Sequence, residues 1–594
     1  MNKWILLLLI TLLPRTAWAQ TQPVVLEQTR QTPCELFVLP DGNALADFGR
    51  AAFGQIEITV RALSAGDTLR LHLGECLRDG RVDRAPGGSR RYRTVVVPLR
   101  EGTHTYRPDI PKDGRNTSGT AIRMPGDVGE VMPFRYVEVE GRRGGLTTSD
   151  VVRIAVNVPF DDDAACFRSG DSVLNAVWEL CRYSIKATSF SGYYVDGDRE
   201  RIPYEADALI NQLCHYATDC RYDVAWRTFA YLIDHPTWPS EWSLQMVLIA
   251  WYDYLYTGST DLISHYADDL RAHTLMALQD SVTGLVTTRR GQTADVLRSI
   301  RRSEPLRDIV DWPHSGTLGL AEGQGGEDDG YVYTDFNTVV NAYHYAAVSR
   351  LAQMFGAIGR KAEAKELATY ARRFRDTFNR AFLDAERGVY TDGVGTDHAS
   401  LHANMFAAVF GLVPEKYRES VACHIVSRGM ACSVYGAQFL LDALYDLNQP
   451  DAALALLTSQ GDRSWSNMIR EGSTITMEAW GNRWKPNQDW NHAWGAAPAN
   501  IIPFRLMGVR PLEPGFGVVE IRPQPGSLGE AECRVPSPKG PVTIRLSEDR
   551  LSVDLPSGMK AKVYLPQQGG RSHKRVKGYV RGSKSWRICT GNIQ

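Results

Sequence analysis

The sequence has almost no net charge and lacks the short motifs of common cofactor and metal enzymes. Its 67 Lys and Arg nearly balance its 68 Asp and Glu, for a formal net charge of −1 at pH 7. Binding to nucleic-acid phosphates needs an excess of positive charge, so we expect no nucleic-acid partner. A Gly-rich phosphate loop, H-E-x-x-H and G-x-S-x-G are all missing. We therefore predict no metal and no organic cofactor.

Closely spaced cysteine pairs are also missing. The ten cysteines are dispersed, and no two form a C-x-x-C pair, which argues against a zinc knuckle or a thioredoxin-like centre. A chain of 594 residues can build its core without disulfides. We expect most of these cysteines to be small buried hydrophobic residues.

Long apolar runs are scarce, and the longest stands at the N-terminus. Lys3 supplies a positive charge, an apolar run follows from Trp4 to Leu13, and Ala17-Trp18-Ala19 is typical of a cleavage site. We predict a signal peptide over residues 1–19, whose removal leaves 594 − 19 = 575 residues. The run is shorter than the ~20 residues that cross a bilayer. The chain is therefore expected to be exported to the periplasm, without stable membrane insertion.

Hydrophobic periodicity divides the remaining chain into three regions. Residues 20–165 alternate with period two, as at Ile56, Ile58 and Val60, which predicts a β-sandwich. Residues 166–508 have a helical period and contain about a dozen segments, mostly in consecutive pairs. Twelve paired helices predict an (α/α)6 barrel. Alternation returns over 509–594 and predicts a second β-sandwich.

Two helical segments illustrate the period of the central region. In Lys361–Phe382, one face carries Leu367, Tyr370, Ala371, Phe374 and Phe378. Residues 434–447 and 451–459 form a predicted helical hairpin, with Asp451 available as the N-cap of its second helix.

Eleven of the fourteen tryptophans lie in the helical region, between Trp178 and Trp494. Trp242, Trp312 and Trp480 fall in loop-like stretches beside carboxylates. Flat apolar rings next to polar groups suit sugars, which present C–H groups on one face and hydroxyls at the rim. The alternative is packing in the core, which we favour for the tryptophans inside helical patterns: Trp178, Trp226 and Trp251.

Two acidic segments are candidates for catalysis. The first, Asp196–Asp207, holds five carboxylates and two arginines. In the second, Glu471–Trp480, Glu478 lies in a weakly polar run. Glycoside hydrolysis needs one carboxylic acid to protonate the leaving oxygen and one carboxylate to activate water or attack carbon. Either segment alone is also compatible with a solvated acidic surface or an ion-pair network.

Together these segments resemble glycoside hydrolase family 78, the α-L-rhamnosidases. The resemblance covers all three regions in the family's order: Gly74–Leu77, Asp79–Asp83, Pro133–Gly141, Asp196–Asp207, Glu471–Trp480, Trp490–Gly495, Gly508–Phe516 and Ile521–Gly526. The first acidic motif departs from the family pattern, because Gly197-Asp198 replaces Cys-Pro and Pro203-Tyr204 replaces Gly-Trp.

The resemblance implies a role for each matching residue. Glu200 is expected to be the general acid and Glu478 the general base of an inverting reaction. Nine further residues are expected to bind substrate: Asp196, Arg199, Asp207, Glu241, Trp242, Asp311, Trp312, Trp480 and His492. The implied substrate is an oligosaccharide or glycoside of plant type that ends in α-L-rhamnose.

Three alternatives stay open from the sequence. A glycosidase of the same fold could act on another sugar, and a catalytically silent homologue could bind glycans for uptake. A polysaccharide lyase is the third, but it needs a Tyr or His base with an Arg that neutralises the uronate. Activity on nitrophenyl glycosides separates the first two.

Overall fold

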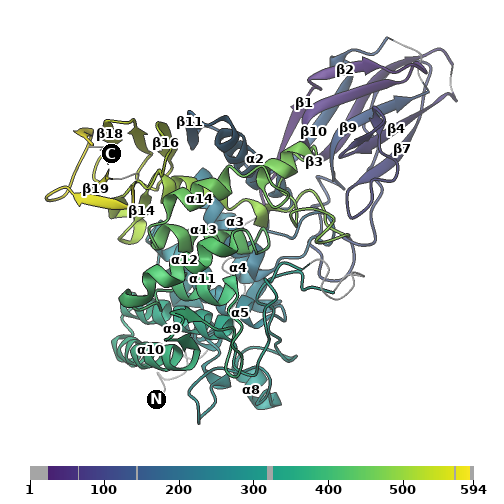
Figure 1. The fold of residues 1–594 in the computed structure, drawn as a ribbon. Helices are drawn as coiled ribbons and strands as arrows, with labels where there is room; N and C mark the ends of the chain where they lie inside the picture. Colours follow the sequence, from purple (N-terminus) through teal and green to yellow (C-terminus); the bar gives the residue numbers. More distant parts are fainter. Residues whose placement is uncertain (1–23, 65, 142–144, 317–325, 568–569, 589–594) are drawn as a thin grey trace, which may run out of the picture.

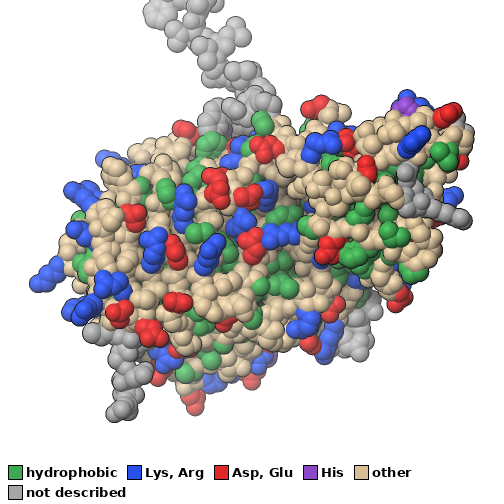
Figure 2. Space-filling view, turned by 90° about the horizontal axis from the view of Figure 1, so that it is seen from above, with side chains coloured by type: hydrophobic (Ala, Val, Ile, Leu, Met, Phe, Trp, Pro, Cys, Tyr) green, Lys and Arg blue, Asp and Glu red, His purple; other side chains and the backbone are tan. Residues whose placement is uncertain are grey.

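The computed structural model describes residues 24–64, 66–141, 145–316, 326–567 and 570–588, and the predicted signal peptide lies outside them. Figure 1 shows three regions: the N-terminal β-sandwich and the C-terminal sheets flank one end of a helical region. None of the described helices has the length and apolar character needed to cross a bilayer. On the face in Figure 2, acidic and basic side chains are interspersed, consistent with the near-zero net charge.

The N-terminal strands form one eight-stranded sheet in the order β1-β10-β3-β9-β4-β7, with β2 and β8 also paired to β3. The strands are β1 Glu27–Gln31, β2 Glu35–Val38, β3 Ala44–Ala62, β4 Thr68–Gly74, β7 Tyr92–Pro98, β8 Gly102–Tyr106, β9 Met132–Glu140 and β10 Val151–Asn157. A register shift between Asp47 and Ala52 interrupts the long strand β3. Ile56, Ile58 and Val60 are buried in this region's own core, so their alternation correctly predicted the inward face.

Six helices of the central region contact one another in a closed ring. In ring order they are α3 Glu205–Thr218, α5 Ser240–Thr257, α9 Thr338–Ala357, α11 Leu401–Val409, α13 Gly436–Asp446 and α16 Pro498–Ile501. An outer helix comes before each inner one along the chain: α2 Ser172–Thr188, α4 Asp223–Asp234, α7 Ala267–Ala272, α10 Lys361–Phe382, α12 Arg418–Arg428 and α14 Pro450–Leu457. This is the predicted (α/α)6 barrel. The shorter helices α6 Asp261–His265, α8 Ala294–Ser299 and α15 Trp465–Arg470 lie in its connections.

Burial distinguishes inner helices from outer ones. Every residue of α3 is buried, because its neighbours in the ring and the outer layer enclose it on all sides. In the outer helix α10, whose bounds match the predicted segment, burial follows a single stripe that contains Leu367, Ala371, Phe374, Phe378 and Phe382.

The inner helices all begin at one end of the ring, which we call the N-terminal mouth. In consecutive antiparallel pairs, the second helices all point the same way. Asp308 accepts hydrogen bonds from Ser240 Oγ at the start of α5 (2.8 Å) and from Asn337 Nδ2 just before α9 (2.8 Å). Asp311 accepts bonds from His402 Nε2 in α11 (2.8 Å) and from the backbone N–H of Ser433 before α13 (2.9 Å). One loop thus joins the starts of four inner helices.

The C-terminal region has a five-stranded sheet, β11-β16-β17-β18-β21, and a four-stranded sheet, β14-β15-β19-β20. The strands are β11 Cys166–Ser169, β14 Val509–Pro511, β15 Val518–Ile521, β16 Ala531–Val535, β17 Val542–Leu546, β18 Arg550–Asp554, β19 Lys560–Gln567, β20 Ser572–Arg575 and β21 Lys584–Arg587. β11 precedes the barrel in sequence but pairs antiparallel with β16. Our division at residue 166 placed this strand with the helices, whereas the structure places it in the C-terminal sheet.

Two local expectations are wrong. Asp451 is not the N-cap of α14, which begins at Pro450; its carboxylate instead accepts a hydrogen bond from Arg571 Nη2 at 2.7 Å. Among the nine cysteines that the structure describes, four are buried: Cys181, Cys214, Cys432 and Cys533. The other five are exposed or partly exposed, so the expectation that most cysteines are buried is wrong for the described residues.

Candidate active site

The first acidic segment connects α2 to α3 and ends in the first turn of α3. Its backbone is held from both sides. Arg201 is fully buried and donates from Nη2 to Asp198 Oδ1 and to the carbonyl of Val131, both at 2.7 Å. At Gly197 (φ +88°) a Cβ atom would lie 2.7 Å from the carbonyl oxygen of Asn491, so only glycine allows this close approach. The loop is therefore fixed against the segment that carries the second acidic motif.

Arg199 joins the two acidic segments. Its Nη2 lies 2.8 Å from Glu478 Oε1 and its Nη1 donates to Glu478 Oε2 at 3.1 Å, a bidentate pair between residues 279 positions apart. The Nε atom lies 3.5 Å from Glu200 Oε1, and Nη2 lies 3.7 Å from Asp196 Oδ2. The two predicted catalytic carboxylates thus meet at neighbouring edges of one guanidinium.

Glu200 and Glu478 lie in different surroundings. The Glu200 side chain is 38% exposed, and its Oε2 accepts a hydrogen bond from the hydroxyl of Tyr204 at 2.9 Å. The Glu478 side chain is only 2% exposed, and Lys485 Nζ lies 3.1 Å from its Oε1. Glu478 is therefore an enclosed carboxylate with two cations, and Glu200 is a partly solvated one with a phenol partner.

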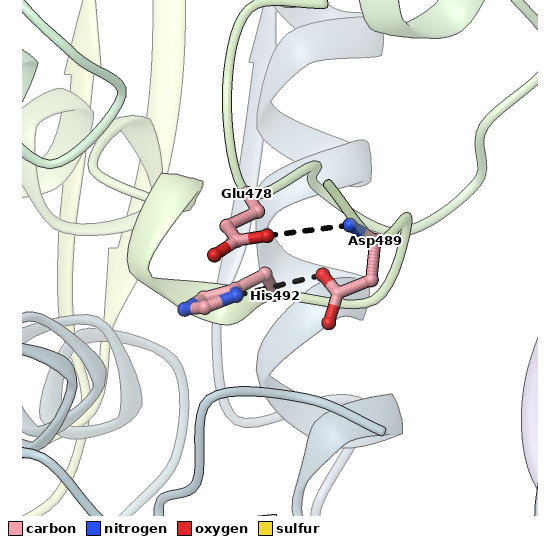
Figure 3. A group of neighbouring side chains, drawn as sticks. All are labelled: Glu478, Asp489 and His492. Atoms are coloured by element: carbon pink, nitrogen blue, oxygen red, sulfur yellow. Dashed lines mark hydrogen bonds and ion pairs between the residues drawn. The ribbon is translucent and has the colours of Figure 1, made fainter. Parts of the chain in front are cut away.

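His492 lies between two buried carboxylates. Its Nε2 is 2.7 Å from Asp207 Oδ1, and its Nδ1 is 3.5 Å from Asp489 Oδ1, an ion-pair distance beyond a good hydrogen bond. Figure 3 shows Glu478, Asp489 and His492 on one loop, with the backbone N–H of Asp489 directed at Glu478. Burial lowers the pKa of His492, but Asp207 and Asp489 outweigh it and raise that pKa well above its usual range. The two carboxylates therefore favour the protonated imidazole.

The two aspartates predicted to bind sugar are shifted by burial. Burial raises the pKa of Asp207, while the charge and hydrogen bond of His492 lower it in part. Burial also raises the pKa of Asp196 well above its usual range, with Arg199 opposing this shift. Asp196 Oδ1 accepts the N–H of Ile202 at 3.0 Å, and its buried Oδ2 has no hydrogen-bond partner among the described residues. Its nearest cation is Arg199 Nη2, 3.7 Å away.

The N-terminal sandwich reaches the site through Glu75, which follows β4. Glu75 accepts the N–H of Arg91 at 2.6 Å and Asn491 Nδ2 at 3.0 Å, and Asn491 Oδ1 accepts the N–H of Asp198 at 2.7 Å. Arg91 Nε lies 2.5 Å from Asp198 Oδ2. Burial raises the pKa of Glu75 to about 8. One buried network therefore links this domain to both acidic segments.

Two of the predicted substrate-binding carboxylates instead support the mouth. Glu241 accepts the N–H groups of Ile309 and Val310, at 3.0 and 2.9 Å, and burial raises its pKa to about 8. Asp311 is occupied by His402 and Ser433, as described above. Because internal bonds already engage both carboxylates, Glu241 and Asp311 position the helix starts in this structure.

The three predicted aromatic walls have different environments. Trp242 is 6% exposed, and its ring packs edge-on against Tyr204 with centroids 5.6 Å apart, next to Glu200. Trp312 is half-buried beside Asp311. Trp480 has no exposed surface; its Nε1 donates to the carbonyl of Cys432 at 2.8 Å and its ring packs against Trp465. Complete burial fits core packing for Trp480 better than the predicted pocket wall. Trp178 is buried, and Trp226 and Trp251 are partly buried against the core, as predicted.

One group of side chains has the spacing of a metal site. Potential ligand atoms of Glu478, Asp489 and His492 lie within 4.8 Å of one another. However, Arg199 and Lys485 already pair with Glu478, and Asp207 already engages Nε2 of His492. The residues present fit an ion-pair network and do not fit a metal.

Two residues that touch the catalytic carboxylates were not selected from sequence: Lys485 and Tyr204. Tyr204 lies inside the first acidic motif, four residues after Glu200, where an aromatic side chain gave no separate signal. Lys485 lies in a loop without periodicity, and the fold alone places its ammonium at Glu478. Seven of the eleven predicted site residues form one connected group at the mouth: Asp196, Arg199, Glu200, Asp207, Trp242, Glu478 and His492.

The ring of six helical hairpins, with two carboxylates and their cations at its mouth, is the architecture expected of the six-hairpin glycosidase class. Three family models match successive parts of the chain: the bacterial alpha-L-rhamnosidase concanavalin-like domain over residues 38–157, the six-hairpin glycosidase domain over 162–505 and the C-terminal domain over 508–580. The central model covers more than half of the sequence. The chain belongs to the family of bacterial alpha-L-rhamnosidase six-hairpin glycosidases.

Three similar alpha-L-rhamnosidases are distant in sequence and longer than this chain. An alpha-L-rhamnosidase from Formosa agariphila is 20% identical over 601 residues, which covers 92% of this chain and 58% of that protein. The alpha-L-rhamnosidase from Aspergillus terreus aligns with a TM-score of 0.73 at 18% identity, over 94% of this chain and 63% of its own. The alpha-L-rhamnosidase from Streptomyces avermitilis, solved with L-rhamnose, aligns with a TM-score of 0.70 at 19% identity. The alignment covers 91% of this chain and 50% of that one. At these identities, the solved structures show the shared fold.

Proposed function

We propose that the protein is an exported inverting glycoside hydrolase that releases terminal α-L-rhamnose from plant-type glycans or glycosides. The observation that carries the proposal is the contact of Glu200 and Glu478 with the same guanidinium, that of Arg199. Hydrolysis by single displacement needs such a pair, one carboxyl to give a proton and one to take it. Similarity to proteins called alpha-L-rhamnosidases, one of them solved with L-rhamnose, supports the choice of sugar.

The surroundings of the two carboxyl groups assign their roles. Glu478 is the base: Arg199 holds it in a bidentate pair, and it takes a proton from the attacking water. Glu200 is the acid, because it is the more exposed group and can reach the glycosidic oxygen of a leaving group that extends into solvent. Water adds to the anomeric carbon as the C–O bond to the aglycone breaks, and the proton of Glu200 goes to the departing oxygen.

The remaining buried polar groups bind the sugar. Asp196 offers a sugar hydroxyl its Oδ2, which accepts no hydrogen bond from the described residues, and Arg199 and His492 lie beside it as cationic donors. Asp207 holds His492 in place. Trp242 and Trp312 are positioned as apolar walls, while Glu241 and Asp311 act by supporting the mouth. The mechanism requires no metal and no organic cofactor.

A panel of nitrophenyl glycosides tests the activity, the sugar and the stereochemistry. We expect the α-L-rhamnoside to be cleaved fastest and the β-anomer of rhamnose to appear first in proton NMR during early turnover. Preference for another glycoside means a different sugar, and no turnover of any glycoside means a silent glycan-binding protein. First appearance of the α-anomer means retention, with Glu478 acting as a nucleophile.

Export has its own test. The full chain is expressed in a bacterium, and the periplasmic fraction is collected for N-terminal sequencing. We expect the mature chain to begin at Gln20. A cytosolic chain that still begins at Met1 contradicts export.

A further inference from the structure

The reaction described above leaves Lys485 without a chemical step. Its side chain is 2% exposed, so it is not a surface lysine. Its Nζ lies 3.1 Å from Glu478 Oε1 and donates to Asn487 Oδ1 at 2.9 Å. A buried ammonium is costly unless it is paired. Burial lowers the pKa of Lys485, whereas Glu478 raises it in part, so this contact is what retains the charge.

The N-terminal sandwich clamps the loop that carries Lys485. The N–H of Ser89 donates to the carbonyl of Gln488 at 2.9 Å, and Ser89 Oγ donates to the carbonyl of Asn487 at 2.8 Å. Arg90 lies over the ring of Trp490, 4.7 Å from its centroid. At Gly88 a Cβ atom would come within 2.8 Å of the Gln488 carbonyl oxygen. The ammonium is therefore held in place from a second domain.

The charged groups around Glu478 suggest a role for the Lys485 ammonium. Glu478 belongs to a group of five carboxyls and three basic side chains: Asp196, Glu200, Asp207, Glu478 and Asp489, with Arg199, Lys485 and His492. Nearby carboxylates favour protonation of Glu478, and adjacent cations oppose it. Removing Lys485 leaves Arg199 as the sole cation in direct contact with Glu478 among the described residues.

We propose that Lys485 is a positioning residue for the catalytic base: its ammonium, fixed by the N-terminal sandwich, holds Glu478 ionised and aimed at water. The inference rests on the proposed function, because it assigns Glu478 the role of base.

The test compares Lys485→Met, which removes the charge, with Lys485→Arg, which keeps it. The acidic limb of kcat/KM against pH, measured on the best nitrophenyl glycoside, reports protonation of the base in the free enzyme. In Lys485→Met we expect this limb to move to higher pH by about one unit, so that kcat/KM on the limb falls about tenfold. In Lys485→Arg, which keeps the positive charge, the acidic limb should stay close to its position in the unmodified chain.

The matched control is Arg483→Met. Arg483 is a cation of the same loop, but its side chain is 77% exposed and pairs with Asp462. We expect the dependence of kcat/KM on pH in Arg483→Met to match that of the unmodified chain. A limb that stays in place in Lys485→Met while kcat falls overturns the proposal, since this is the pattern of a purely structural residue. If Lys485→Met does not fold, Lys485→Gln replaces it with the same expectation.

A second measurement separates this inference from the proposed function. The chain is labelled with ¹³C at glutamate carboxyls, and the Glu478 signal is assigned as the one missing in Glu478→Gln. We expect its titration midpoint in Lys485→Met to lie about one pH unit above that in the unmodified chain. Unchanged midpoints overturn the role of Lys485 even in a chain without turnover. A shifted midpoint in an inactive chain supports the electrostatic role and contradicts only the proposed function.

Discussion

At the scale of single residues, the site separates two carboxyl groups by exposure and by partner. Glu200 is partly solvated and bonded to the hydroxyl of Tyr204, while Glu478 is enclosed with Arg199 and Lys485. The difference follows from where each chain segment runs: Glu200 is on the loop before α3, and Glu478 is on the loop whose residues 487–490 contact the N-terminal sandwich. The fold thus gives the proposed proton donor and the proposed proton acceptor different surroundings.

The acid role of Glu200 predicts a dependence on the leaving group. Glu200→Gln should lower kcat/KM by about 10²–10⁴ on rhamnosides with poor leaving groups, and far less on dinitrophenyl rhamnoside, which leaves without protonation. Steady-state kinetics over a series of aryl rhamnosides measures this. An equal loss across the series removes Glu200 from the acid role. Tyr204→Phe, which deletes one hydrogen bond to Glu200, serves as a milder control.

Trp480 and Trp312 should respond differently to truncation. Trp480 is fully buried, so Trp480→Ala should destabilise the fold by about 3–5 kcal/mol and lower the Tm clearly. Trp312 is half-buried at the mouth, so Trp312→Ala should raise KM with little change in Tm. Calorimetry and kinetics on both variants check this. An unchanged Tm with raised KM in Trp480→Ala would restore its predicted role as a pocket wall.

At the scale of secondary-structure elements, the network around Glu75 connects a strand end to two loops. The pKa of about 8 for Glu75 lies above the unfolded value, so its contribution to stability is fully present below about pH 4.5 and is lost as pH rises through 8. Glu75→Gln does not titrate. We therefore expect the stability of the unmodified chain, relative to Glu75→Gln, to fall as pH increases from 5 to 9.

The change in unfolding free energy follows from the pKa shift of Glu75, at about 1.4 kcal/mol for each unit by which the folded and unfolded pKa values differ. Denaturant unfolding of both chains at pH 5, 7 and 9 measures the difference. Gln loses an acceptor at either the Arg91 N–H or the Asn491 amide, so the variant is expected to be the less stable chain at pH 5. A difference that is constant with pH shows that Glu75 does not titrate in this range.

Helices and strands that bury only one face could be predicted from the sequence. Elements that are buried on all sides, or that pair with a distant part of the chain, could not. The stripe of Lys361–Phe382 gave α10 with its bounds, because an outer helix faces solvent on one side. The inner helix α16 is a single buried turn, Pro498–Ile501, without any stripe to detect. The strand β11 has four residues, and it pairs with β16, more than 360 positions away in the sequence. A pairing at that separation cannot be detected from the local sequence pattern.

The candidate site divides along the same line. Acidic motifs marked the two segments, and the family resemblance singled out Glu200 and Glu478 within them. Periodicity carries no information about which carboxylates remain free once the chain is folded. Glu241 and Asp311 are bonded internally, and Lys485 was missed, because these outcomes depend on contacts between distant loops.

At the scale of the whole molecule, both flanking regions are built into the barrel. The N-terminal sandwich is joined through Glu75 and Arg91, and the C-terminal sheet is joined through β11, which leads directly into α2. Phe167 on β11 is buried and packs against Trp178 of α2, with ring centroids 6.0 Å apart. Such continuous burial predicts that barrel and C-terminal sheets unfold together.

The substitution Phe167→Ala tests this coupling. It removes a buried ring at the junction, so we expect a loss of about 3–5 kcal/mol that lowers the unfolding midpoints of barrel and sheets by the same amount. Tryptophan fluorescence follows the barrel, far-ultraviolet circular dichroism follows both parts, and residual activity follows the mouth. Arg168→Ala, at the exposed neighbouring position of β11, should leave all three unchanged. Early loss of β-sheet signal with retained activity would mean that the C-terminal sheets unfold alone, and that β11 attaches them to the barrel without stabilising it.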